Sequence, residues 1–269
     1  MPAHCFWQGN SMEREILLER GGLHTLIKVS EPDFGAPARL VLGVHGLGGS
    51  TDDAIQTGIA EEMAMFSAVS IRFDFPGHGR SPMSDGEFTV ENCLHTVVEV
   101  AAWARESYPQ LEDLCIFATG FGAYITLLAL DTLQAMPGRL KLVVQTPSIR
   151  MHETLLAMMH MSRETFRAMD HYVFPIARPL TVRYDFYEEL QENLAFNTYD
   201  VPMLILHGEE DSFIRMSDIR HFRRINEEAK LVFIPGASHR FLEEGAWDMV
   251  LDLTRDWFAF EQVLVCDWE

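Results

Sequence analysis

The sequence has no long apolar run, little positive charge and few cysteines. No apolar segment approaches the roughly 20 residues that a membrane-spanning helix needs, and the stretch from Met1 to Arg20 has no basic region followed by an apolar core. With 21 Lys and Arg against 40 Asp and Glu, the formal net charge of −19 repels nucleic-acid backbones and anionic lipid. These absences predict a cytoplasmic protein that binds neither nucleic acid nor a membrane.

The cysteines and histidines do not form the patterns of a disulfide framework or a metal site. Cys5, Cys93, Cys115 and Cys266 are widely spaced, without a Cys-x-x-Cys pair, and Cys93 and Cys115 lie inside apolar patterns where a thiol acts as a small hydrophobe. No pair of potential ligands has convincing spacing for a metal. We therefore expect no disulfide framework, no metal and no organic cofactor.

Apolar strand patterns alternate with helical patterns along most of the chain. The 269 residues are 48% hydrophobic, enough for the core of one domain over 1–269. A hairpin is predicted at 15–29 around Gly21-Gly22, and a helix over 52–66 with Asp52 or Thr51 as its N-cap. The other predicted strands are 39–44, 67–73, 114–119, 140–145, 201–208 and 230–235, and the other helices are 88–108, 216–228 and 242–260. This alternation indicates an α/β protein with a mostly parallel sheet covered on both faces.

The alternation stops between positions 146 and 200. This segment is rich in Met, aromatic residues and His, and it has no run typical of a buried strand. We expect it to be an insertion that lies over the sheet as a lid, because pockets in open α/β sheets lie at the carboxyl ends of the strands.

The stretch 114–128 predicts a strand, a tight turn and a helix. Ala118 and Gly122 occupy the small positions of the pattern small-x-nucleophile-x-small, in which small residues let strand and helix approach closely. The central residue, which should carry a hydroxyl or thiol, is Gly120. Thr119 is one position away, so its side chain is expected to point away from the cleft.

Four further motifs lie along the chain. Two precede the turn at Gly120, namely His45-Gly46-Leu47-Gly48-Gly49 and Arg72 to Ser81, and two come after it, namely Leu206 to Asp211 and Pro235 to His239. Together with the turn at Gly120 they make the chain resemble the α/β-hydrolase superfamily over nearly its whole length. The resemblance implies an α/β-hydrolase fold: a mostly parallel eight-stranded sheet, helices on both faces and a lid. The segment 178–190 resembles the short lid of bacterial cinnamoyl and feruloyl esterases.

The resemblance also implies roles for individual residues. His239 would be the general base and Asp211 the acid that orients it, with Glu210 as the alternative acid, because the triad of this family runs nucleophile, acid, histidine. The N–H groups of Leu47 and Phe121 would form the oxyanion hole. The expected substrate-binding residues are His45, Gly46, Met158, Tyr184 and Phe186. The implied activity is that of a carboxylic ester hydrolase for small aromatic or hydroxycinnamate-like esters, and a homodimer is compatible with it.

Gly120 departs from this family at the nucleophile. Without a side-chain oxygen it cannot form an acyl-enzyme, so the chain should be nearly inert as a serine hydrolase. Three explanations remain open: an engineered or selected change of Ser to Gly in a working esterase, a natural pseudo-hydrolase that binds a small apolar ligand, and catalysis by a water that His239 activates. A C–C bond hydrolase or an aminopeptidase of the same fold also remains open. In each case glycine relieves the strain of the turn.

Overall fold

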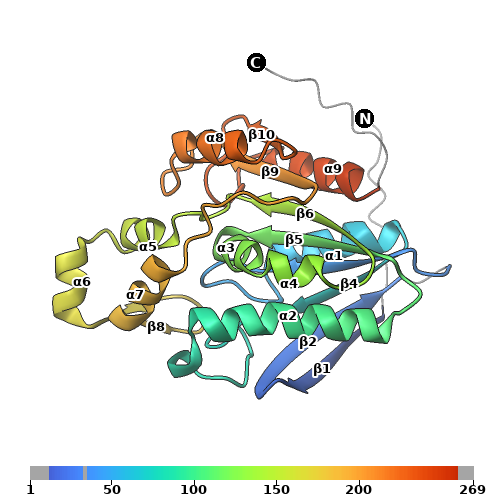
Figure 1. The fold of residues 1–269 in the computed structure, drawn as a ribbon, viewed down its shortest axis with the longest axis horizontal. Coiled ribbons are helices and arrows are strands. Elements are labelled where there is room, and N and C mark those ends of the chain that lie inside the picture. The colour runs from blue at the N-terminus through green and yellow to red at the C-terminus, as the bar shows by residue number, and fades with distance from the viewer. Residues whose placement is uncertain (1–11, 33–34, 260–269) are drawn as a thin grey trace.

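The computed structural model describes residues 12–32 and 35–259 (Figure 1). The expectations for Cys5, Cys266, Phe260 and the loop positions 33–34 therefore lie outside the described residues, as does most of the N-terminal stretch. Cys93 and Cys115 are buried free thiols. None of the helices in the described ranges combines the length and the apolar character needed to cross a membrane.

The strands form an eight-stranded sheet in the order β1-β2-β4-β3-β5-β6-β9-β10. The first two are the predicted hairpin and pair antiparallel, β2 pairs antiparallel with β4, and every later pairing is parallel. The predicted mostly parallel sheet of eight strands is confirmed. The strands are β1 (Met12–Arg20), β2 (Leu23–Glu31), β3 (Arg39–Val44), β4 (Ala68–Phe73), β5 (Asp113–Thr119), β6 (Arg139–Gln145), β9 (Met203–Gly208) and β10 (Lys230–Ile234).

Helices cover both faces of this sheet, because successive side chains of its buried strands point to opposite faces. On β5, Leu114 and Ile116 join the larger core cluster, whereas Cys115 and Phe117 join the smaller one. The smaller cluster packs against α1 (Ala54–Met65) and α9 (Ala246–Phe258). The larger cluster packs against α2 (Val90–Ser107), α3 (Gly120–Leu128), α4 (Leu130–Gln134) and α8 (Met216–Ile225).

Two helix starts differ from the sequence expectation. The N-cap of α1 is Asp53, not Asp52 or Thr51. The carboxylate of Asp52 pairs with Lys28 instead, and the N–H of Thr51 donates to Asp74. Helix α9 begins at Ala246 rather than at 242, because Gly245 precedes it in a left-handed conformation (φ 76°) that interrupts the helical path.

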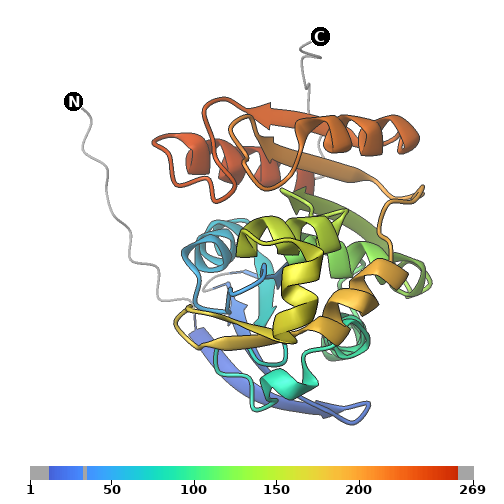
Figure 2. The same ribbon diagram turned by 90° about the vertical axis from the view of Figure 1, so that its left-hand side faces the viewer.

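The chain between β6 and β9 gathers at one side of the sheet, at the left of Figure 1 and toward the viewer in Figure 2. It contains α5 (Met151–Met159), α6 (Arg163–Met169), β7 (His171–Phe174), β8 (Leu180–Arg183) and α7 (Tyr184–Glu192). Strands β7 and β8 form a separate antiparallel pair, too short to give the run of a buried strand. The short 3-10 helix η1 (Asp85–Glu87) lies against β8.

One arginine joins this segment to the loop after β4. Arg178 donates hydrogen bonds to the carbonyl oxygens of Ser81 (2.7 Å) and Met83 (3.1 Å). Because buried carbonyls need donors, this guanidinium holds the β7 to β8 connection against the main body of the protein.

Candidate active site

The residue at the centre of the turn from β5 into α3 has a left-handed backbone conformation, which glycine adopts most easily. Gly120 has φ 49°, in the left-handed region, where a side chain is strained. Two residues on, a Cβ atom on Gly122 would lie only 2.4 Å from the carbonyl oxygen of His45. Gly122 therefore lets α3 approach the end of β3, which brings the two loops of the predicted oxyanion hole together.

His239 and Asp211 form a hydrogen-bonded pair beside this turn. Nδ1 of His239 lies 2.8 Å from Oδ2 of Asp211, whose carboxylate is fully buried. Oδ1 of Asp211 accepts hydrogen bonds from the N–H groups of Phe213 and Ile214. Burial raises the pKa of the Asp211 carboxyl, but the hydrogen bonds from His239 and from these N–H groups outweigh it and hold the pKa below its usual value. An ionised Asp211 makes Nδ1 of His239 the donor and leaves Nε2 as an acceptor.

Nε2 of His239 faces residue 120. A Cβ atom on residue 120 would lie 3.9 Å from His239 Nε2 and 4.0 Å from the Cα of Gly46, both ordinary van der Waals distances. The site therefore has room for a side chain at position 120. The hydroxyl of a serine there could reach His239, because its oxygen extends about 1.4 Å beyond Cβ, into hydrogen-bond range.

His45 fixes the loop that follows β3. It is buried, Nδ1 lies 2.8 Å from the carbonyl oxygen of Gly46, and Nε2 accepts a hydrogen bond from the N–H of Phe75 (3.1 Å). Burial lowers the pKa of His45 to about 4, although the bond to Gly46 opposes the shift. His78, whose ring lies 5.2 Å from that of His45, has its pKa lowered to about 3 by burial and by His45. Both imidazoles are therefore neutral at pH 7.

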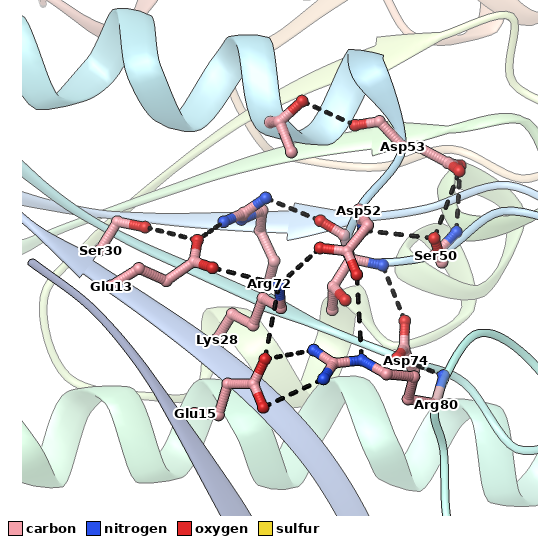
Figure 3. Close-up of polar contacts among 12 residues, drawn as sticks. Glu13, Glu15, Lys28, Ser30, Ser50, Asp52, Asp53, Arg72, Asp74 and Arg80 are labelled. Atoms are coloured by element: carbon pink, nitrogen blue, oxygen red, sulfur yellow. Dashed lines mark hydrogen bonds and ion pairs between the residues drawn. The ribbon is translucent and has the colours of Figure 1, made fainter. Parts of the chain in front are cut away.

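Charged residues hold the continuation of this loop against the sheet (Figure 3). The N–H of Thr51 donates to Asp74 (2.7 Å), and the carbonyl of Thr51 accepts from Arg72 (2.7 Å). Arg72 also pairs with Glu13 on β1. Both the N–H and the carbonyl of Thr51 are thereby held by side chains. This fixes the preceding part of the loop, which carries the N–H group of Leu47.

A cavity of about 620 Å³ opens at the carboxyl ends of β3, β5 and β6. It brings together Gly46, Leu47, Gly120, Phe121, Met158 and His239 among the residues that the sequence singled out. Asp211 lies behind His239. The N–H of Phe121 belongs to the first turn of α3, where N–H groups have no intrahelical partner and are free to bind an anion. The remaining lining is mostly apolar: Ala54, Ile55, Met151, Ile176, Ala177, Phe213 and Leu242.

Three of the expected substrate-binding residues are not brought to this cavity. His45 is turned into the loop that it holds. Tyr184 and Phe186 are only 7% and 3% exposed: Tyr184 packs on Phe166 and stacks on Tyr187 (ring centroids 5.5 Å apart in both cases), and Phe186 packs on Phe88 (4.5 Å). These aromatics form the core beneath the segment between β6 and β9, because large apolar side chains there bury one another first.

The structure adds polar residues that sequence reasoning missed. Gln145, Thr146 and Ser148 line the cavity from the end of β6, and Asp53 and Arg240 line its rim. The end of a parallel strand beside the predicted turn was the available signal for the first three. Thr119 also lines the cavity, contrary to expectation: its hydroxyl lies 3.4 Å from where a Cβ on Gly46 would be, so it faces the loop after β3.

No cluster of three or more His, Cys, Asp or Glu side chains suited to a metal ion occurs among residues 12–32 and 35–259. Within that part of the chain the polar groups of the cavity include the imidazole of His239, which Asp211 holds, and the N–H group of Phe121 at the start of α3.

Comparison with known proteins places this geometry in a family. A family model described as "Alpha/beta hydrolase family" matches residues 41–253. No curated protein matches the chain. Among solved structures, Est1E from Butyrivibrio proteoclasticus, determined with ferulic acid bound, is similar with a TM-score of 0.75 at 19% identity, over 88% of this chain and 94% of its own.

Two further solved structures show the same fold. A putative hydrolase from Agrobacterium vitis has a TM-score of 0.75 at 16% identity, over 92% of this chain and 99% of its own. Alpha/beta hydrolase domain-containing protein 10 from mouse has a TM-score of 0.70 at 14% identity, over 90% of this chain and 97% of its own. The match of the family model covers most of the sequence and spans the elements that carry Gly120, Asp211 and His239. The chain belongs to the alpha/beta hydrolase family.

Proposed function

We propose that this protein carries the site of a serine-type carboxylic ester hydrolase in which Gly120 stands at the nucleophile position. The chain with Gly120 binds small esters but forms no acyl-enzyme. The observation that carries the proposal is the distance of 3.9 Å between His239 Nε2 and the place of a Cβ on residue 120, in a cavity that leaves that place free. A serine at this position would place its hydroxyl within reach of His239, which could then act as its general base.

The preserved partners of the nucleophile support this proposal. Asp211 orients His239, and Leu47 and Phe121 line the cavity where an oxyanion would form. Removal of the serine from a triad costs about 10⁶ in turnover, while about 10³ to 10⁴ over water survives through binding and the oxyanion hole. The chain with Gly120 is therefore expected to retain only that remainder.

The cavity wall supports a small aromatic or hydroxycinnamate-like ester as the ligand. Its apolar side chains, among them Met158 and Ile176, suit a planar apolar group, and its volume of about 620 Å³ lies in the usual range for small-molecule sites. Ferulic acid bound to Est1E makes such acids reasonable first probes. We also propose that segment 146–200 acts as the lid, because Met151, Met158 and Ile176 reach the cavity from it.

The proposal is tested with p-nitrophenyl and methyl hydroxycinnamate esters, hydrolysed by the chain with Gly120 and by Gly120→Ser side by side. A gain of several orders of magnitude in kcat, up to about 10⁶, is expected for the variant, since the remaining machinery is in place. If both chains are inert while an aromatic acid still binds, the protein is instead a non-catalytic binding protein that uses the same cavity. If neither hydrolysis nor binding is found, the proposal fails.

A further inference from the structure

Ser148 lies beside the nucleophile position, although it comes from a different strand. It follows β6 by three residues, and its N–H donates a hydrogen bond of 3.2 Å to the carbonyl oxygen of Gly120. This bond ties the two backbones together. The residue is only 2% exposed, yet it lines the cavity, and its hydroxyl lies 3.9 Å from where a Cβ on residue 120 would be.

The hydroxyl of Ser148 and the imidazole of His239 converge on one point. His239 Nε2 is also 3.9 Å from the Cβ place, and neither atom makes a hydrogen bond within the part of the chain that the structure describes. We propose that Ser148 is a positioning residue that, together with His239, holds a water in front of Gly120, so that water attacks the ester directly. This inference rests on the proposed function of the same cavity.

The geometry favours a water over Ser148 itself as the attacking group. Ser148 and His239 are not hydrogen bonded to each other, so the base does not activate this hydroxyl directly, whereas a water can bridge two polar groups that do not touch. A water needs two to four polar partners. Ser148 and His239, which both line the cavity, supply two of them. The water stands where a serine hydroxyl would stand relative to Leu47 and Phe121, whereas Ser148 is displaced from that place.

The reaction balances without a covalent intermediate. The water oxygen forms a bond to the ester carbonyl carbon, and His239 Nε2 takes one of its protons while Ser148 accepts a hydrogen bond from the other. The N–H groups of Leu47 and Phe121 stabilise the tetrahedral oxyanion. The carbon to alkoxy-oxygen bond then breaks, and His239 returns its proton to the leaving alkoxide. Ester and water give acid and alcohol.

The test compares Ser148→Ala in two backgrounds with methyl ferulate as substrate. In the chain with Gly120 we expect the variant to lower kcat about tenfold, the effect of one hydrogen bond to the reacting group, with the dissociation constant for ferulic acid changed less than about twofold. In the Gly120→Ser background the loss in the rate of acylation should not exceed about twofold, because the serine hydroxyl, and not a water, attacks the ester in that step. A general loss of structure would lower both backgrounds alike.

Ser70→Ala is the matched control, because Ser70 is equally buried (2%) on β4, its hydroxyl has no hydrogen-bond partner among the described residues, and it does not line the cavity. Ser70→Ala should leave kcat unchanged in both backgrounds. Intact-mass measurement of the chain with Gly120 during turnover should find no acyl adduct.

Three results would overturn the inference. They are an equal loss of rate in both backgrounds on Ser148→Ala, an acyl adduct on Ser148, or hydrolysis of bound methyl ferulate no faster than in buffer. If ferulic acid does not bind and Gly120→Ser gains no activity, the proposed function fails, and this inference fails with it.

Discussion

The backbone at Gly120 can carry a side chain only at a cost in strain. Its φ of 49° lies in the left-handed region, but the nearest atoms to a Cβ there are 3.9 Å away. The strain of a side chain here would therefore come from the backbone conformation of residue 120 itself, and not from contacts with neighbouring residues. A serine at this position would lower the stability of the fold and would supply the nucleophile.

We therefore predict that Gly120→Ser and Gly120→Ala both lower the free energy of unfolding by about 1 kcal/mol. Thermal or denaturant unfolding of the three chains measures this directly. Only the serine variant should gain esterase activity, so the alanine variant separates the backbone effect from the hydroxyl. An unchanged or raised melting temperature for Gly120→Ser would contradict the strain argument.

At the scale of single residues, motif order predicted Gly120, Asp211 and His239 as one group, and the structure brings them together. It did not predict the part of Ser148, because the path of the chain after β6 depends on packing that no local pattern encodes. It also assigned Tyr184 and Phe186 to the ligand. An aromatic in an insertion has the same sequence signature whether it lines a cavity or packs in a core.

At the scale of elements, the site depends on how closely α3 approaches β3. Gly122 permits this contact, since a Cβ would meet the carbonyl oxygens of His45 at 2.4 Å and Val44 at 2.6 Å. Backbone atoms at such distances cannot yield as a flexible side chain can. The strand-turn-helix pattern and its two small residues were readable from sequence, but the start of α9 and the N-cap of α1 were not, because tertiary partners decided them.

We predict that Gly122→Ala lowers the free energy of unfolding by about 3 kcal/mol, because α3 must move away from β3. Gly86→Ala is the control, since its Cβ would meet only Ser84 Oγ at 3.5 Å, and a change within about 0.5 kcal/mol is expected there. Denaturant unfolding of both variants checks this. Equal stability of the two would show that α3 does not press on the loop as described.

At the scale of the whole molecule, two neutral histidines are buried beside the predicted oxyanion loop. The pKa of His45 is lowered to about 4 and that of His78 to about 3, mainly by burial. In the unfolded chain both would titrate near 6.5. The unfolded state therefore binds protons that the folded state does not, and the free energy of unfolding must fall as the pH drops through 6.5.

We predict a loss of about 2 kcal/mol per histidine between pH 7 and pH 5, a window in which carboxylates contribute little. Denaturant unfolding at half-unit steps of pH measures it. His78→Gln should be less stable at pH 7 but should show a flatter pH dependence. A free energy of unfolding that stays constant from pH 7 to pH 5 would contradict the buried, neutral state of these side chains.

The overall architecture was the most predictable level. Near-continuous apolar strands alternating with amphipathic helices fix a parallel sheet with two covered faces, and the eight strands were all found. The small β7 and β8 pair was not, because four-residue strands carry too little periodicity to be distinguished from loops.

The central claim is that Gly120 replaces the nucleophile of an otherwise complete ester site. The most direct measurement mixes Gly120→Ser with a p-nitrophenyl hydroxycinnamate ester and follows p-nitrophenolate release together with the intact mass of the protein. We predict a stoichiometric burst and an acyl adduct on residue 120, with neither in the chain with Gly120. A variant that binds the ester but shows no burst and no adduct would contradict the claim.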